Sequence, residues 1–117
     1  NNYRGFYGGD RLKRDTAYHQ GTAWAWLLGA FVTAHYRVYG DAEVAASYLQ
    51  PLADHLNDHG LGTISEIFDG DPPHTPRGCP AQAWSVAEVL RAWRVLYPDR
   101  ALAAESIVSA STQETGD

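Results

Sequence analysis

Apolar and aromatic residues recur at steps of three and four positions along the first third of the chain, which is the spacing of one helix face. Seven positions follow this pattern: Trp24, Leu27, Leu28, Phe31, Val32, His35 and Tyr36. Thr22 is placed to cap the helix at its start, and Gly40 is placed to end it, because glycine suits the left-handed residue that follows a helix. The pattern therefore predicts a first helix that begins at Thr22 and stops at Gly40.

A second helix is predicted from Asp41 to about His59, with Asp41 as the N-cap and Glu43 in the first turn. Its apolar face consists of Val44, Ala45, Tyr48, Leu49, Leu52, His55 and Leu56. Pro51 lies inside this pattern, so we expect a kink or a break there. The short connection at Gly40 favours an antiparallel hairpin between the two helices.

A third helix is predicted to begin at Pro80, a residue suited to the first helical position, and to end at Tyr97–Pro98. Its apolar stripe consists of Trp84, Ala87, Val89, Leu90, Trp93 and Leu96. Residues 1–18 are expected to form an ordered loop, and residues 99–117 a weakly helical tail that frays. The pattern as a whole indicates an all-α chain of three to four helices, built from antiparallel helical hairpins.

Residues 61–79 interrupt the helical pattern with three prolines and three glycines, yet they also hold Ile64, Ile67 and Phe68. A loop of this length with embedded apolar residues is typical of a functional loop. Glu66 lies among these apolar residues, and such surroundings raise a carboxyl pKa and suit a general base. The alternative is a solvated loop residue or a cap. Asp69 and Asp71 could bind a hard cation, but their spacing favours a turn with Asx hydrogen bonds.

A second group of polar and aromatic side chains precedes the first helix. His19 and Gln20 are followed by Trp24 and Trp26, which are two positions apart and should point in different directions. One indole facing a cleft beside His19 and Gln20 suits a sugar, because aromatic faces cover the apolar faces of the ring and polar groups bind its hydroxyls. The alternative is that both tryptophans are packing groups.

Metal and thiol chemistry find less support. His55 and His59 are four residues apart on one helix face, a usable ligand pair, but a solvated or interhelical pair is the favoured interpretation. Cys79 stands alone, and we expect a small buried residue at a helix start. The sequence therefore predicts no metal site.

Composition narrows the classes of partner. The chain has 117 residues and a formal net charge of −5 without a cluster of Lys or Arg, which argues against nucleic acid and against an anionic membrane surface. Its longest apolar run, residues 23–33, is shorter than the roughly 20 residues that a membrane span needs. One cysteine excludes a disulfide within the chain. The sequence contains no Met, so we expect a mature product or a piece of a larger protein.

Two long motifs carry a family resemblance: AYHQGTAWAW at residues 17–26 and GLGTISEIFDGDPPHTPRGCPAQAWSVAEVLRAW at residues 60–93. They closely resemble the C-terminal region of bacterial and archaeal-type glycogen debranching enzymes, the amylo-α-1,6-glucosidase family. The resemblance implies part of an (α/α)6 toroid, in which six helical hairpins surround a sugar pocket, with residues 1–98 as its C-terminal segment. Twelve helices of about 11–12 residues exceed this chain, so we expect self-association or a partner chain that supplies the rest.

The resemblance also implies roles for individual residues. Glu66 matches the catalytic general base that activates water. The remaining matches line or shape the glucose pocket: His19, Gln20, Trp24, Trp26, Asp69, Arg77, Gln82 and Trp84. Ala25 stands where the family usually has Pro between the two tryptophans, and no part of the chain matches the family's general acid.

The implied activity is hydrolysis of α-1,6 branch points in glycogen or a limit-dextrin type α-glucan, with inversion, without a cofactor and in the cytoplasm. An inverting glycosidase needs two carboxyl groups, so we expect little activity from a chain that holds only the base. Two alternatives stay open: a non-catalytic helical module that binds glucan or scaffolds a partner, and a helical hairpin pair without a ligand.

Overall fold

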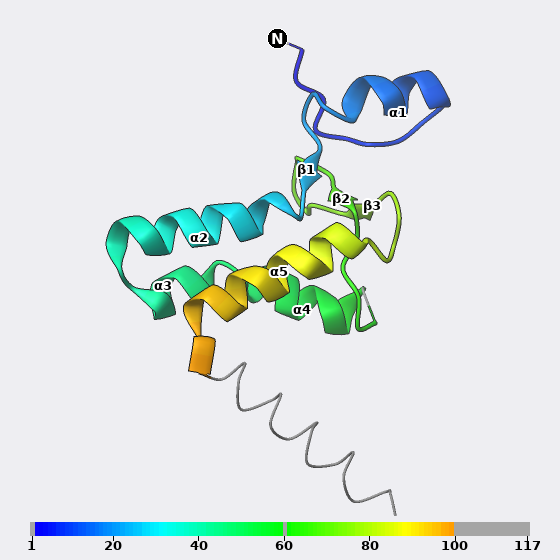
Figure 1. Ribbon diagram of the computed structural model, residues 1–117. Helices are drawn as coiled ribbons and strands as arrows, with labels where there is room; N and C mark the ends of the chain where they lie inside the picture. The colour runs from blue at the N-terminus through cyan, green and yellow to red at the C-terminus, as the bar shows by residue number, and fades with distance from the viewer. Residues whose placement is uncertain (1, 60, 100–117) are drawn as a thin grey trace, which may run out of the picture.

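A computed structural model describes residues 2–59 and 61–99 of the chain. These residues form five helices and a three-stranded sheet (Figure 1). The elements are α1 (Arg11–Ala17), β1 (Ala23–Trp24), α2 (Leu27–Tyr39), α3 (Ala42–Ser47), α4 (Gln50–Asp58), β2 (Ile67–Phe68), β3 (Pro76–Arg77) and α5 (Ala83–Leu96). The described chain is thus mostly helical, and the small sheet corrects the all-α expectation. The expected helical start of the tail begins at position 100 and lies outside the residues that the structure describes.

Helices α2, α3, α4 and α5 form one layer that meets the sheet at one end (Figure 1). α2 and α5 lie side by side and both begin near the sheet, while α3 and α4 lead back toward it from the far end (Figure 1). Gly40 ends α2 in a left-handed conformation with φ 73°, and the Asp41 side chain caps α3 by accepting from the Val44 N–H at 3.0 Å. The predicted hairpin and both of its caps are confirmed.

The predicted interruption at Pro51 is also confirmed. α3 ends at Ser47 and α4 begins at Gln50, which places Pro51 in the first turn of a new helix. Proline is tolerated there because the N–H that it lacks would have no helical partner. Leu49, between the two helices, is buried in the core.

One continuous core joins the helices to the loop. Val32 of α2 and Ala45 of α3 are fully buried with Ala92 of α5. A second cluster contains Leu52, Ala25 and Ile64, and it is joined to the first because Leu28 and Val89 pack against both. The stripe predicted for the third helix is therefore partly wrong. Its buried face includes Ser85, Ala92 and Leu96, whereas three large members of the predicted stripe are exposed: Trp84, Leu90 and Trp93.

Two predicted helix starts are wrong because backbone pairing competes with the helix. Ala23 and Trp24 pair with β2, opposite Phe68 and Ile67, so α2 begins only at Leu27. The Thr22 hydroxyl, predicted to cap that helix, instead donates to the Ala17 carbonyl at 3.0 Å.

The third helix begins at Ala83 and not at Pro80. Gln82 is its N-cap residue in an extended conformation, and the Gln82 N–H donates to the Ile64 carbonyl at 2.9 Å. This bond ties the helix start to the long loop, and it explains why the helix does not extend further toward the N-terminus.

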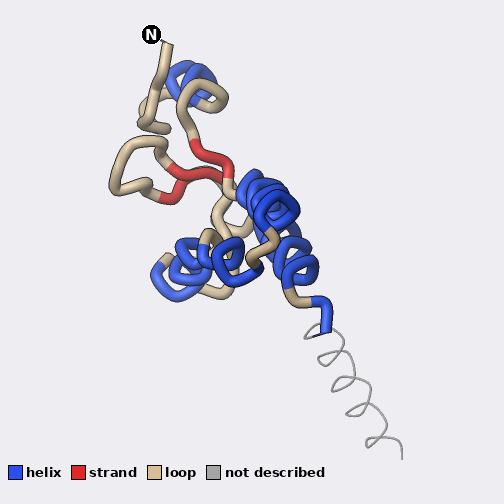
Figure 2. The backbone as a smooth tube through the Cα atoms, turned by 90° about the vertical axis from the view of Figure 1, so that its left-hand side faces the viewer, coloured by secondary structure: helices blue, strands red, loops and turns tan. Residues whose placement is uncertain are grey.

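The sheet connects the two parts of the molecule. Its strands are antiparallel in the order β1, β2, β3, with Ile67 of β2 opposite both Trp24 and Arg77. In the rotated view the strands lie between the helical layer and the N-terminal part that contains α1 (Figure 2). Segments far apart in the sequence, around residues 17–26 and 66–77, therefore meet at the sheet.

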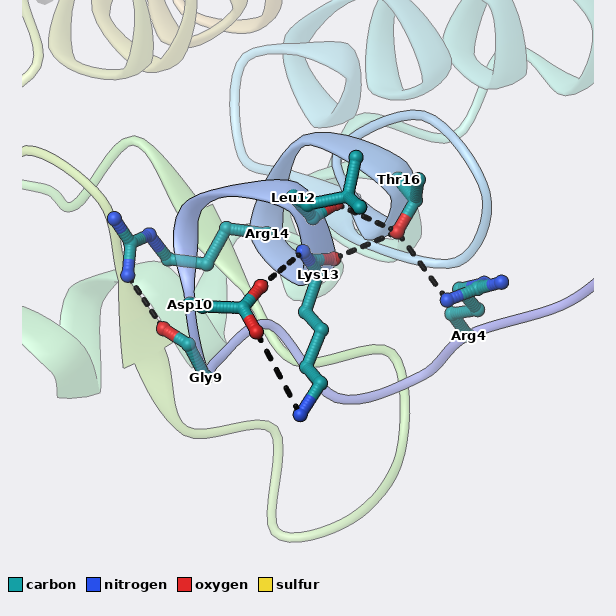
Figure 3. A network of polar contacts seen from close by, with 7 residues as sticks. All are labelled: Arg4, Gly9, Asp10, Leu12, Lys13, Arg14 and Thr16. Atoms are coloured by element: carbon teal, nitrogen blue, oxygen red, sulfur yellow. Dashed lines mark hydrogen bonds and ion pairs between the residues drawn. The ribbon is translucent and has the colours of Figure 1, made fainter.

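The N-terminal part holds a helix that the sequence pattern missed. Asp10 caps α1 by accepting from the Lys13 N–H at 2.9 Å, and the Arg14 guanidinium donates to the Gly9 carbonyl (Figure 3). Residues 1–18 are thus not wholly a loop, because an aspartate cap is sufficient to start a short helix. Arg4 extends the network by donating to the Thr16 hydroxyl at 3.2 Å.

The helical layer leaves apolar surface uncovered. A groove of about 440 Å³ beside α2 is lined by apolar side chains that include Leu28, Phe31 and Leu52. A second groove, of about 290 Å³, lies between α4 and α5 and includes Leu90 and Trp93. None of the helices in the described residues has the length and apolarity to cross a bilayer.

The core predicts a clear contrast between two valines of α2. Val32→Ala should lower the free energy of unfolding by about 2 kcal/mol, because two fully buried methyl groups are lost and a cavity remains. Val38→Ala, on the exposed face of the same helix, should change it by less than about 0.5 kcal/mol. Urea unfolding of the two variants measures the difference, and equal effects would contradict this core.

Candidate functional site

Glu66 lies at the start of β2 with both carboxylate oxygens held. Oε1 accepts a hydrogen bond from the Tyr18 hydroxyl, and Oε2 accepts one from the Cys79 N–H at 2.9 Å. The Glu66 N–H in turn donates to the Cys79 carbonyl at 2.9 Å. In both of these bonds an oxygen of the half-buried side chain accepts. Cys79 is exposed, which corrects the expectation of a small buried residue.

Tyr18 is a site residue that the sequence did not reveal. Burial raises the pKa of Tyr18 to about 12, with further contributions from the hydrogen bond to Glu66 and from the charge of Glu66. The phenol therefore keeps its proton at neutral pH and donates to Glu66. Tyr18 directly precedes His19 in the first motif, but no spacing rule predicts that it meets a residue 48 positions later.

Tyr18 also contacts the aromatic group beside it. Its ring lies edge-on to Trp24, with 4.5 Å between ring centroids, and 5.0 Å from the ring of His19. The Trp24 indole N–H donates to the Tyr18 carbonyl at 3.1 Å. One side chain therefore links Glu66 to the aromatic residues of the first motif.

Those aromatic residues line a cleft of about 250 Å³, formed by His19, Trp24, Trp26, Leu27 and Trp84. The rings of His19 and Trp24 are stacked with only 5° between their planes, and Trp26 meets Trp84 edge-on at 5.9 Å. Four of the predicted pocket residues are thus brought together from both motifs, with both indoles of the first motif at the cleft. Glu66 does not line this cleft; it is connected to the cleft through Tyr18.

Gln20 and Gln82 do not line the aromatic cleft. Gln20 is exposed, and its carbonyl accepts from the Arg4 N–H at 2.9 Å. Gln82 is half-buried at the start of α5, where its N–H is bonded to the Ile64 carbonyl. In the described contacts both residues connect segments through their backbone groups.

The buried Asp69 and the half-buried Arg77 form an ion pair that holds the N-terminal segment. Asp69 is 5% exposed, and its Oδ2 accepts from two Arg77 nitrogens at 3.0 and 3.1 Å. Its Oδ1 accepts from the Tyr7 N–H at 2.8 Å, and the Arg77 guanidinium lies 5.0 Å from the Phe6 ring centroid. All these contacts are internal to the chain. Asp71 has a separate partner, the Tyr3 hydroxyl, at 2.9 Å.

A buried polar cluster fixes the residue directly before Glu66. His55 Nε2 accepts from the Ser65 N–H at 3.3 Å and lies 3.2 Å from the Ser65 hydroxyl, while the Ser85 hydroxyl donates to the Ser65 carbonyl at 2.9 Å. His55 is thus an interior hydrogen-bonding residue, and its ring stacks 5.7 Å from that of His59. Within residues 2–59 and 61–99 no group of three or more metal-ligating side chains occurs. Ser85 escaped notice because periodicity assigns serine to a polar face.

The backbone before Cys79 approaches Glu66 closely. Gly78 has φ +70°, and a Cβ atom there would lie 2.5 Å from Glu66 Oε2 and 3.0 Å from a side-chain carbon of Ile67. Only glycine places the Cys79 N–H against the carboxylate in this way.

Comparison with known proteins gives one result. The family model described as amylo-alpha-1,6-glucosidase matches residues 1–91, a span that contains both motifs, the cleft and Glu66. A search of the curated proteins and a search of the solved structures each gave no match.

At Gly78, the energetic cost of a steric contact with Glu66 can be measured separately from the cost of the left-handed backbone. Gly78→Ala should lower the free energy of unfolding by roughly 2–4 kcal/mol, the sum of a left-handed strain and a steric contact with Glu66. Gly40→Ala is the matched control, since Gly40 has φ +73° and open space where its Cβ would lie.

The control should lose only the strain contribution, about 1 kcal/mol. Urea unfolding of both variants gives the comparison, and the contact with Glu66 would be contradicted if the two alanine substitutions cost the same.

Proposed function

The chain belongs to the amylo-alpha-1,6-glucosidase family, and from this membership we propose that it supplies the general base and one pocket wall of a glycogen-debranching glycoside hydrolase. The substrate is glycogen or a limit-dextrin type α-glucan, hydrolysed at its α-1,6 branch points. The observation that carries the proposal is the Glu66 carboxylate, oriented by two donors and connected through Tyr18 to an aromatic cleft.

Glu66 takes the proton from the attacking water in this mechanism. The water oxygen attacks the anomeric carbon from the face opposite to the leaving oxygen, and the configuration inverts. Positioned proton transfer of this kind contributes about 10²–10⁴-fold in rate. The hydrogen bonds from Tyr18 and Cys79 support the assignment, because they fix the carboxylate without giving it a positive ion partner.

The general acid is proposed to lie outside this chain. An inverting enzyme needs its two carboxyl groups roughly 6.5–9.5 Å apart. Asp69 is close in sequence to Glu66, but it is buried, and Arg77 and Tyr7 donate to its oxygens, so we assign it to the fold. The chain on its own is therefore expected to hydrolyse little or no substrate.

The aromatic cleft is proposed as the wall that binds glucose. Indole faces match the apolar faces of a sugar ring, and the imidazole of His19 is available to a hydroxyl. The rings of His19 and Trp24 are parallel and stacked, and Trp26 and Trp84 close the cleft from the helix starts. The reaction uses water and two carboxyl groups, and no cofactor enters it.

The helical layer is proposed to be part of an (α/α)6 toroid. Support comes from the hairpin of α2 with α3 and α4, and from the position of the sheet and cleft at the end where α2 and α5 begin. The two uncovered apolar grooves support a further proposal, that other helices cover them. These helices belong either to the rest of a longer chain or to a partner chain.

A second candidate is a non-catalytic glucan-binding module. It is favoured by one observation: the cleft is formed by aromatic side chains, and Glu66 does not line it. This candidate predicts glucan binding that is independent of Glu66 and no hydrolysis even in the full-length protein.

Glu66→Gln tests the catalytic role in the full-length protein. Hydrolysis of an α-1,6-branched limit dextrin should fall by about 10²–10⁴-fold, because the amide cannot accept the proton of water, while glucan affinity should be unchanged. Glu43→Gln, on the exposed surface of α3, is the control and should retain full activity. Retention of most activity by Glu66→Gln would overturn the assignment.

Two tryptophans of α5 test the proposed pocket wall. Trp84→Ala should weaken the binding of maltooligosaccharides by on the order of 1 kcal/mol, because one face of the cleft is lost. Trp93 lies in the groove between α4 and α5, so Trp93→Ala should leave the affinity for maltooligosaccharides unchanged. Isothermal titration calorimetry distinguishes the two, and the cleft is not the glucan site if both variants bind like the unsubstituted protein.

A further inference from the structure

Ser65, directly before Glu66, is held at each of its three polar positions by buried groups. Its N–H and hydroxyl meet His55 Nε2, and its carbonyl accepts from Ser85. The three side chains are 6%, 1% and 0% exposed for His55, Ser65 and Ser85. Buried polar side chains that are hydrogen-bonded to one another fix their geometry, because breaking any bond would leave a buried group unpaired.

The cluster fixes the backbone one peptide away from the carboxylate. His55 and Ser85 stand on helices α4 and α5, which are rigid supports, whereas Ser65 lies in the connection between α4 and β2. The other hydrogen bonds of Glu66, with Tyr18 and Cys79, hold its carboxylate oxygens and its N–H. Ile64, one residue earlier, is also tied to α5 by the Gln82 N–H and packs with Leu52 of α4. The cluster adds bonds from both helices to Ser65, the residue that adjoins Glu66.

We infer that His55 is a positioning residue for Glu66, acting through Ser65, and that only its neutral form supports catalysis. The inference rests on the proposed role of Glu66 as general base. A displacement of about 1 Å in a reacting group can reduce turnover by about 100-fold, and buried supporting contacts are what prevent such displacement.

The protonation state follows from the donors. Because the Ser65 N–H points at Nε2, this nitrogen must carry a lone pair, and the proton of the neutral ring is on Nδ1. A protonated ring would set its Nε2–H against the Ser65 N–H and lose that backbone bond, although the Ser65 hydroxyl, 3.2 Å away, could still accept from it.

The groups that face His55 come from its own helix, from the loop that follows it and from β2. His59 and Asp58 lie on its own helix, and Ser65 and the Phe68 ring face it from the loop and β2. Burial lowers the pKa of His55 below its ordinary value of 6.5, with the charge of His59 acting in the same direction and that of Asp58 opposing it. His55 is thus neutral at pH 7 and takes up a proton only on further acidification.

The test is steady-state kinetics of the full-length protein on an α-1,6-branched limit dextrin at pH 7.5. His55→Leu keeps the bulk of the side chain and removes the acceptor, so kcat should fall by about 10–100-fold with KM changed by less than about twofold. His55→Gln can present an oxygen to the Ser65 N–H and should restore kcat to within a few-fold of the unsubstituted protein. His59→Gln, exposed one turn further along α4, is the control and should retain kcat.

A pH profile provides a readout that packing alone would not change. The acidic fall of kcat in the unsubstituted protein should include the protonation of His55, and His55→Gln should lose that component and remain active to lower pH. Ser85→Ala, a smaller change that removes the bond to the Ser65 carbonyl, should also lower kcat and covers the case in which His55→Leu does not fold.

The outcomes separate the two proposals. If Glu66→Gln is inactive while His55→Leu and Ser85→Ala turn over normally, the positioning inference is wrong and the base assignment stands. An equal loss in His55→Gln and His55→Leu, with an unchanged pH profile, would also overturn the inference. Activity retained by Glu66→Gln would instead overturn the proposed function.

Discussion

The hydrogen bond from the Tyr18 hydroxyl to Glu66 joins the two motifs on which the molecule depends. It connects segments 48 residues apart, and it forms only because β1 pairs with β2 and brings Trp24 opposite Ile67. Two-residue strands are too short to be stable alone. The pairing is supported from outside by the N-terminal segment, where Gly5 accepts from the Gly70 N–H at 2.7 Å and Tyr7 donates to Asp69.

Two kinds of interaction therefore build the site: apolar burial forms the helical layer, and hydrogen bonds place the carboxylate on it. Apolar burial between α2, α3 and α5 sets the helical layer, and it is insensitive to pH and to the identity of surface groups. The carboxylate is placed by polar bonds instead: Tyr18 and Cys79 hold its oxygens, and His55 and Ser85 hold the backbone before it through Ser65. Such bonds are directional, so they orient a group in a way that apolar contacts cannot.

Much of this arrangement follows from the sequence. The hairpin, its caps at Gly40 and Asp41 and the interruption at Pro51 are local features, each set by residues within one or two turns. The strands are not local, because each has two residues and the residues that pair are at least eight positions apart. The sequence pattern therefore places the start of the first helix too early. Periodicity places Trp84 and Trp93 on an apolar stripe of α5 because it records apolar positions and not what covers them; only the family resemblance points Trp84 to the pocket. Ser85 and Tyr18 were missed for the opposite reason, since a polar side chain gives no periodic signal of burial.

In the proposed mechanism Glu66 activates the attacking water, on the face of the sugar opposite to the leaving oxygen. The most direct measurement is cleavage of an α-1,6-branched dextrin by Glu66→Ala in the full-length protein, with and without sodium azide, followed by identification of the sugar product by NMR. Azide is a nucleophile that needs no general base, so it can attack the anomeric carbon in place of water while the leaving oxygen is protonated. We expect cleavage to be lost without azide and to return with it, and the product to be the β-glucosyl azide. Cleavage that persists without azide, or a product that retains the α configuration, would contradict this mechanism.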